Sequence, residues 1–534
     1  MVSTVSSIVA SVLDTDKVYL GSRSLSSIIF IGVACALLIR SFIYVRLACT
    51  SHSVLLLNYN QRFRLAYSTP LRHVPGPWYA KFTARGLRAN DAFGNRWYYI
   101  QALHKKYGSI VRIAPGEVAI SDPKVVSKVH ALGTEFRKRQ QPGTPFNIFS
   151  ISDPKAHRTR QRFYAKAFSD ETLKASTEPA VRQLVETAVA GIKQDATETK
   201  ARNADVYKWC MLFGSDVAFH VIYGNSHTNG LMATHKSTDE VIMGAYLQRM
   251  IAWAQFCFPV FLIGRWLSPI SPTLHSIFRV EKKYADFWEE GQRQRDIAAK
   301  TVFVQNTKYS KNDGVFSVSD EVKLSDVDIA HDITTFLGAG GEPVGASLVF
   351  LIWQILRMPD LQRELEAEVA GITEPLTDAT LSQLPILNAV IYETLRLYGG
   401  GVTQMPRYAP TTTDLGGYII PPNTAVVTHT GALHRNPAAW DDAETFDHTR
   451  WLSPSQSKTL VQDRFQPFSS GARACIAIHL VMIELRLFVS VFFRECAGAK
   501  LAPSTTDSSM RILDRFHICP NAKRCEVIVP DAKA

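Results

Sequence analysis

The stretch from Pro467 to Leu480 reads PFSSGARACIAIHL and places Cys475 directly before an apolar run with helical character. Backbone amides at the start of a helix favour a thiolate over a thiol, so a cysteine there is suited to bind a soft metal or to act as a nucleophile. Gly471 permits a tight turn, Arg473 adds a positive charge, and Phe468 offers an aromatic wall. For a lone cysteine, however, a buried structural role is the more common alternative.

The composition of the 534-residue chain restricts the class of protein. Its eight cysteines have neither the dense spacing of a disulfide scaffold nor the paired C-x-x-C of a zinc site, which favours a reducing environment. The formal net charge is +11, but the basic residues are spread along the chain without a lysine-rich tail. We therefore expect no nucleic-acid partner, and a membrane surface or an acidic protein partner explains the charge equally well.

Residues 25–45 read LSSIIFIGVACALLIRSFIYV, about the length of a helix that spans a bilayer. The one charged residue in this segment, Arg40, lies near its end, where a long side chain reaches the membrane interface. A cleaved signal peptide is the competing interpretation, but the apolar run starts late and lacks a basic cluster before it. Because more basic residues follow the segment than precede it, the bulk of the chain is expected in the cytoplasm. The expected organisation is a lumenal tail over 1–24, this single anchor, a linker with a Pro-rich elbow over 46–77 and a catalytic domain over 78–534.

The coarse pattern of the remaining chain predicts a mainly helical protein with small β-sheets. Residues 107–121 alternate around Pro115 and Gly116, which is typical of a hairpin. Ser325 and Asp328 resemble a capping box at the start of a long helix. Helical patterns cover Ser169 to Asp195, Ser325 to Met358, Asp360 to Ala370, Pro385 to Leu397 and the run after Cys475.

The segment FSSGARACIA resembles the haem-binding loop of the cytochrome P-450 family, F-x-x-G-x-R-x-C-x-G. It matches at Phe468, Gly471, Arg473 and Cys475 and departs at Ala477, which stands where the family has glycine. The resemblance implies a cytochrome P-450 fold in which Cys475 is the axial thiolate ligand of haem b iron. It also implies that Arg473 pairs with a haem propionate.

Other motifs follow the family's order. ETLR supplies Glu393 and Arg396, and FDHTRW, which resembles F-x-P-x-R-W with His448 in place of the proline, supplies Arg450. The resemblance implies that these three form a buried network that stabilises the haem-side core. MPRYAP supplies Arg407, which the resemblance makes a second propionate partner.

One helix near residue 160 departs from the family pattern. DPKAHRTRQRFYAKAFS resembles the W-x-x-x-R helix, but its tryptophan and arginine positions hold His157 and Gln161. Arg160 or Arg162 takes over the propionate contact on this interpretation, and the sequence leaves the choice between them open.

The long helix contains a second departure. The family's oxygen-activating pattern A-G-x-[D/E]-T aligns with residues 339–343, whose small residues are expected to leave room for dioxygen and substrate, and Pro343 replaces the threonine. Proline lacks the hydroxyl that serves proton delivery, but it also frees the carbonyl of Ala339 and is expected to kink the helix. Our hypothesis is that a water held there, with the catalytic carboxylate Glu342, carries protons instead.

The resemblance implies a membrane-anchored monooxygenase of the microsomal, filamentous-fungal type. It would insert one oxygen atom from dioxygen into an apolar small molecule, by hydroxylation or epoxidation, in secondary-metabolite biosynthesis of a terpenoid or polyketide. NADPH-cytochrome P-450 reductase is the expected electron donor, and the endoplasmic reticulum membrane the expected location. The loss of the threonine at Pro343 keeps a haem-thiolate isomerase, dehydratase or peroxide-using enzyme as an alternative, and a non-catalytic haem-binding protein is the least favoured.

Overall fold

The computed structural model describes residues 66–139, 147–224, 232, 324–373, 375–400, 406–453, 464–515 and 517–530. The chain divides into two compact units, Met1–Ser68 and Thr69–Ala534, and the helices and strands with defined bounds all belong to the second. The predicted anchor at 25–45 and most of the predicted linker lie outside the described residues.

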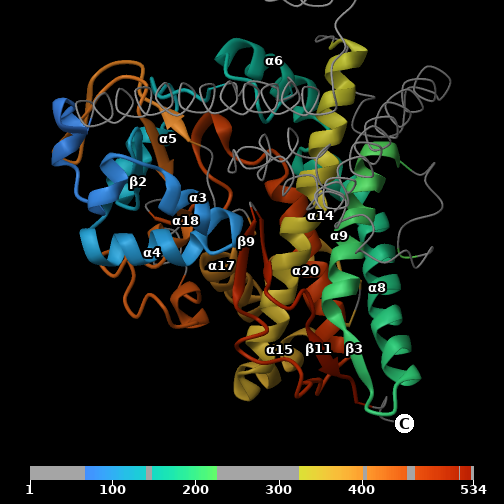
Figure 1. Cartoon of the computed structure of the whole chain (residues 1–534). Coiled ribbons are helices and arrows are strands. Elements are labelled where there is room, and N and C mark those ends of the chain that lie inside the picture. Colours follow the sequence, from blue (N-terminus) through green and yellow to red (C-terminus); the bar gives the residue numbers. More distant parts are fainter. Residues whose placement is uncertain are drawn as a thin grey trace, which may run out of the picture. The chain divides into compact units, whose positions relative to one another are not determined.

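Helices dominate the second unit (Figure 1). The α-helices are α3 (Arg85–Ala92), α4 (Arg96–Tyr107), α5 (Pro123–His130), α6 (Pro154–Ala165), α7 (Asp170–Thr172), α8 (Glu178–Glu198), α9 (Val206–Tyr223), α14 (Asp326–Leu356), α15 (Pro359–Ala370), α16 (Asp378–Leu381), α17 (Pro385–Tyr398), α18 (Thr430–Leu433) and α20 (Ile478–Glu495). Short helical turns are η1 (Pro70–His73), η2 (Trp78–Lys81), η3 (Leu173–Thr177), η5 (His448–Trp451) and η6 (Gly471–Arg473).

Within the described residues the strands form four small sheets. One has the order β1-β2-β7-β4, in which β2 pairs antiparallel with β1 and parallel with β7. The others are β3-β11-β8 and the hairpins β9-β10 and β5-β6. The strands are β1 (Ile110–Ala114), β2 (Glu117–Ile120), β3 (Asn203–Asp205), β4 (Arg407–Tyr408), β5 (Thr413–Leu415), β6 (Tyr418–Ile420), β7 (Ala425–Thr428), β8 (Lys500–Leu501), β9 (Ile512–Arg515), β10 (His517–Pro520) and β11 (Glu526–Ile528).

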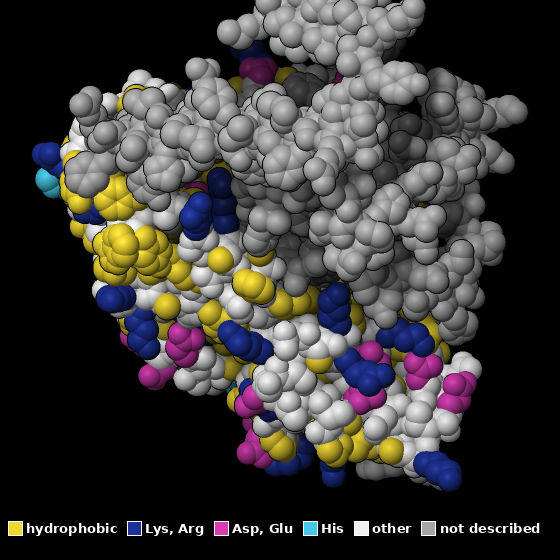
Figure 2. Space-filling model, viewed as in Figure 1, with side chains coloured by type: hydrophobic (Ala, Val, Ile, Leu, Met, Phe, Trp, Pro, Cys, Tyr) yellow, Lys and Arg dark blue, Asp and Glu magenta, His cyan; other side chains and the backbone are white. Residues whose placement is uncertain are grey.

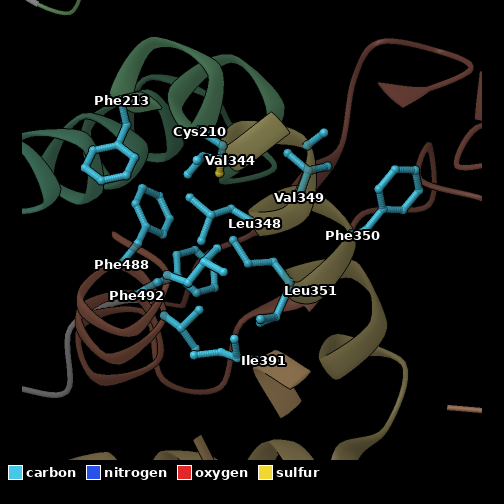
Figure 3. Packing of buried hydrophobic residues seen from close by; sticks show 14 of the residues in the cluster. Cys210, Phe213, Val344, Leu348, Val349, Phe350, Leu351, Ile391, Phe488 and Phe492 are labelled. Atoms are coloured by element: carbon cyan, nitrogen blue, oxygen red, sulfur yellow. The ribbon is translucent and has the colours of Figure 1, made fainter. Parts of the chain in front are cut away.

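The main core lies between α14 and the helices around it. Figure 3 shows Phe213 of α9 and Phe488 of α20 pointing toward each other, with ring centroids 5.0 Å apart, and Val344 and Leu348 of α14 beside them. All four side chains are buried. Of the described helices, one is long and apolar enough to cross a membrane, namely α14 over His331–Leu356, and 56% of that window is buried inside the protein. Its apolar character is therefore that of a central core helix.

Most local predictions for this unit are confirmed. The expected hairpin is β1 and β2, whose register pairs Ile110 with Ile120 around the predicted turn. The long helix begins at its predicted cap, because the Ser325 hydroxyl accepts the backbone N–H of Asp328. The observed bounds of α15 and α17 differ from the predicted helices by one residue at one end.

The Pro-rich elbow lies against the first sheet. The backbone N–H of Arg112 in β1 donates to the Pro75 carbonyl at 2.7 Å, and a side chain at Gly76 would overlap the Arg112 carbonyl. This part of the predicted linker is thus packed into the globular unit. On the face shown in Figure 2, Lys and Arg side chains are interspersed with acidic and apolar ones, in agreement with their spread along the sequence.

Candidate active site

The Cys475 loop is a tight turn that leads into α20. The backbone N–H of Cys475 donates to the Phe468 carbonyl at 2.9 Å, and that of Ala474 donates to the Gly471 carbonyl at 3.1 Å. Among the five described cysteines Cys475 alone is exposed, whereas the other four are buried. The structural role that is usual for a lone cysteine therefore does not fit this one.

Gly471 is required by the shape of this loop. Its φ of +68° lies in the left-handed region, and a Cβ atom there would overlap the backbone oxygen of His130 at the end of α5. The glycine thus lets the loop pack against α5, which fixes where Arg473 and Cys475 lie. Phe468, half-buried at the start of the loop, packs against the main core.

Cys475 lies on the wall of a cavity of about 550 Å³. The cavity is also lined by Ile476 and His479 after the loop and by Gln161 and Phe168 from the α6 side. The Cys475 side chain is open to the cavity but surrounded by protein atoms, and this burial, with the charge of Glu484, raises the pKa of its thiol. The Ala477 amide lowers that pKa, as predicted for the start of a helix, and a cation bound to the sulfur would favour the thiolate further.

A group of cations lies beside this loop. Burial is the main reason that the pKa of Arg407 is lowered to about 10, and the charge of Arg473 adds to it. The pKa of Arg473 is likewise lowered to about 10, mainly by burial and further by the charge of Arg137. Burial, with Arg407 and Arg473 as further causes, lowers the pKa of Lys138 to about 6. Burial, with the same three cations as further causes, lowers the pKa of His157 to about 4. These groups repel one another in the protein alone, so the cluster is suited to receive anions.

The contacts of Arg473 support that interpretation. Within the described part of the chain, its Nη1 is buried and has no hydrogen-bond partner. Its Nη2 reaches the Ser152 carbonyl at 3.5 Å, and the acid that contributes to its pKa is Asp153, the N-cap of α6. A buried guanidinium nitrogen without an acceptor is costly unless a ligand supplies one. Two carboxylates of a haem would match this cation cluster in charge, and Cys475 would supply the soft ligand for its iron.

The two arginines of α6 lie in different surroundings. Arg160 is buried, with 3% of its side chain exposed, and forms ion pairs with Asp328 and, at 2.7 Å, with Asp332 of α14. Its charge is therefore matched by these two acids. Arg162 is exposed and lines the cavity together with Cys475, so its contact with a propionate stays a prediction. Lys138, which precedes α6 in the chain and was not predicted, is a further cation near Arg407 and Arg473.

The predicted trio of Glu393, Arg396 and Arg450 is present. Glu393 and Arg396 are both fully buried, and Arg396 donates to both carboxylate oxygens of Glu393, at 2.7 and 2.8 Å. Arg450 lies farther away, with its Nε 3.5 Å from a Glu393 oxygen. Trp451 completes the network by donating its indole N–H to Glu393 at 2.9 Å. Apart from the place of Trp451 in the FDHTRW segment, no feature of the sequence pointed to this contact.

The α14 segment over the predicted oxygen-activating pattern is helical throughout, including Pro343. A Cβ atom at Gly341 would lie 2.7 Å from the Ser215 hydroxyl of α9, and one at Gly345 would lie 2.7 Å from a methionine sulfur of the same helix. The close packing of α9 accounts for these two glycines, so the expectation of room for dioxygen is wrong for Gly341, the one of the two that lies within residues 339–343. At Gly338, by contrast, a Cβ atom would meet no atom of the described residues within 4 Å.

Glu342 has a partner that the sequence did not reveal. Its Oε2 lies 3.0 Å from Nδ1 of His517, the first residue of β10. The side chain of Glu342 is 21% exposed and that of His517 is 8% exposed. An imidazole at this distance holds a carboxylate by a hydrogen bond and is able to exchange a proton with it.

Comparison with known proteins defines the class. The cytochrome P450 family profile matches residues 74–509. The chain is 84% identical, over 83% of its length and all of the relative, to a methylphloroacetophenone oxidase from Cladonia uncialis. It is 38% identical to the cytochrome P450 monooxygenase stcB of Emericella nidulans, over 88% of this chain and 90% of that one. The solved haem domain of cytochrome P450DA matches with a TM-score of 0.68 at 19% identity, covering 85% of this chain and 96% of that one.

The chain therefore belongs to the cytochrome P450 family. The predicted fold, mainly helical with small sheets, and the predicted function, a P450 monooxygenase of fungal secondary metabolism, are confirmed. Membership implies a haem-thiolate cofactor, dioxygen and a small-molecule substrate. The names of these relatives, monooxygenase and oxidase, give no support to the alternatives of an isomerase, a dehydratase or a non-catalytic haem protein.

Proposed function

We propose that Cys475 binds the iron of haem b as a thiolate and that Arg473, Arg407 and Lys138 bind its two propionates. The observation that carries this proposal is the unpartnered, buried Nη1 of Arg473 within a cluster of mutually repelling cations beside an exposed cysteine. When bound, the haem supplies the activation of dioxygen and the oxidising power. Gly471 holds the loop in place, and the surrounding chain keeps the cofactor oriented and restricts the access of water.

We propose that residues near α14 manage the protons of the reaction. Glu342 lies directly before Pro343 on α14, with 21% of its side chain exposed, and holds or releases a proton at its Oε2. Pro343 lacks the hydroxyl that serves in this place in related enzymes, so the carboxylate is the proton-bearing group of the segment.

The substrate we propose is a small phenolic ketone of polyketide type. The relative that is 84% identical is named for methylphloroacetophenone, and identity of this degree over 83% of the chain favours a substrate of the same class. The test is incubation with methylphloroacetophenone under isotopically labelled dioxygen, followed by mass analysis of the product. A product that carries one labelled oxygen shows oxygen insertion, and an unlabelled oxidised product shows substrate oxidation without insertion.

We further propose that the chain is anchored in the endoplasmic reticulum membrane by residues 25–45, with the catalytic domain over 78–534 in the cytoplasm. NADPH-cytochrome P450 reductase is the proposed electron donor. The sequence supports both proposals, through its apolar segment and through a net charge of +11 that attracts an acidic partner.

The decisive experiment for the haem site is the carbon-monoxide difference spectrum of the reduced protein. We expect a thiolate-type band in the wild type and its loss in Cys475→Ser. Cys496→Ser is the matched control, because this cysteine is buried at the other end of α20. A wild-type protein without the band, or a Cys475→Ser variant that keeps it, contradicts the assignment.

A further inference from the structure

The contact between Glu342 and His517 joins two elements that are far apart in the sequence. Glu342 is on α14 and His517 is on the β9-β10 hairpin, and the distance between Oε2 and Nδ1 is 3.0 Å. Both side chains are mostly shielded from solvent, with exposed fractions of 21% and 8%. A hydrogen bond between partly buried and potentially charged groups is stronger than one at the surface and holds both side chains in place.

Pro343 takes part in a second contact that supports this arrangement. A Cβ atom at Gly400, just after α17, would lie 2.6 Å from the Cα and carbonyl oxygen of Pro343, so the two backbones touch. The Gly400 carbonyl in turn accepts the backbone N–H of Ile518 at 3.3 Å. Ile518 follows His517 in β10. Glu342 is therefore linked to His517 directly by the hydrogen bond and also indirectly through the backbone contacts of Pro343, Gly400 and Ile518.

Glu342 stands directly before Pro343 on α14, so its carboxylate is one residue from the position at which the family's hydroxyl is missing. With 21% of its side chain exposed, Glu342 is not closed off within the core. The carboxylate is therefore suited to take over the role of that hydroxyl in proton transfer.

We propose that His517 is the positioning residue of Glu342 and resupplies its proton, in place of the alcohol that Pro343 lacks. In each transfer the Nδ1–H bond of the imidazolium breaks, an O–H bond forms at Glu342 Oε2, and the neutral imidazole takes up the next proton from solvent. This inference rests on the proposed monooxygenase function, because that reaction consumes protons. The hairpin that carries His517 thus contributes to proton delivery.

The test measures how NADPH consumption divides between product and hydrogen peroxide, with methylphloroacetophenone as substrate. In His517→Gln the amide can still donate a hydrogen bond to Glu342 but cannot supply a proton. We expect product per NADPH to fall about ten-fold and peroxide to rise, with similar NADPH consumption. Glu342→Gln should give the same result, and the double variant should be no worse than either single one. His73→Gln, which changes an exposed histidine, is the control.

Two further measurements separate this role from a merely structural one. Pro343→Thr in the His517→Gln background returns a hydroxyl to the helix and should restore most of the coupling. The carbon-monoxide stretching frequency of the reduced protein reports the hydrogen bonds around the bound gas, and we expect it to shift alike in His517→Gln and Glu342→Gln. It should stay unchanged in His73→Gln.

The outcomes distinguish this inference from the proposed function. Unchanged coupling in His517→Gln, with a normal thiolate-type band, overturns the role of His517 and leaves the haem site standing. Additive losses in the double variant also overturn it, because they show that the two residues act separately. If the wild type lacks the thiolate-type band, the proposed haem site fails, and this inference fails with it.

Discussion

Replacement of Arg396 by lysine should strongly destabilise the folded chain. Each of the five N–H groups of this guanidinium has an acceptor in the structure. Nε and one N–H of Nη2 donate to Glu393, and the other three donate to buried backbone carbonyls at 2.6–2.9 Å. These carbonyls belong to His434, Ala443 and Thr445.

The size of the effect follows from counting donors. A lysine has three N–H donors and no planar fork, so at least two of the five acceptors lose their partner. An acceptor left unsatisfied in the interior costs about 1–3 kcal/mol, which gives about 2–6 kcal/mol for Arg396→Lys. Since a domain has a stability of about 5–15 kcal/mol, the loss is a large fraction of the total.

The assay is urea unfolding followed by the decay of the thiolate-type band, so that global stability and the haem site are measured together. Arg363→Lys is a matched control, because Arg363 pairs with Asp360 at the same three-residue spacing but with 70% of its side chain exposed. We expect the control to stay within about 0.5 kcal/mol of the wild type. An Arg396→Lys variant within about 1 kcal/mol of the wild type would refute the donor count.

Three further substitutions test other parts of the molecule. Gly471→Ala places a Cβ atom against a neighbouring carbonyl at φ +68° and should reduce the amount of bound haem severalfold. In the control Gly116→Ala the new Cβ atom meets no described atom within 4 Å, and the amount of bound haem should stay unchanged. Lys138→Met removes one cation beside the cysteine loop and should speed haem dissociation about ten-fold, with the exposed neighbour Arg139→Met as control. Burial raises the pKa of Asp205 to about 6, so this group costs stability as the pH rises through that value. Asp205→Asn keeps an oxygen that caps α9 but removes the titrating group. Its free energy of unfolding, measured in urea relative to that of the wild type, should rise by about 1 kcal/mol between about pH 5 and about pH 7.5.

Features that depend on a few neighbouring residues could be predicted from the sequence. The turn at Gly471, the cap at Ser325 and the pair of Glu393 and Arg396 are each determined within about four residues, where backbone geometry leaves few alternatives. The face of a glycine on α14 could not be read in this way. Gly341 and Gly345 pack against α9, a helix more than a hundred residues earlier, and nothing in the local pattern distinguishes that contact from an open face above the haem.

The placement of charge at the candidate haem site illustrates the same limit. The sequence left Arg160 and Arg162 open as propionate partners, and of these Arg160 pairs with two acids at the start of α14. Lys138 stands in the basic run FRKRQ, which by sequence alone is an ordinary solvated segment. Burial beside Arg407 and Arg473 makes its ammonium costly, as the lowered pKa shows, and an anion between the three would remove that cost. The proposed propionate site therefore rests on where buried cations gather beside the cysteine loop, and the position of an arginine within a motif does not decide it.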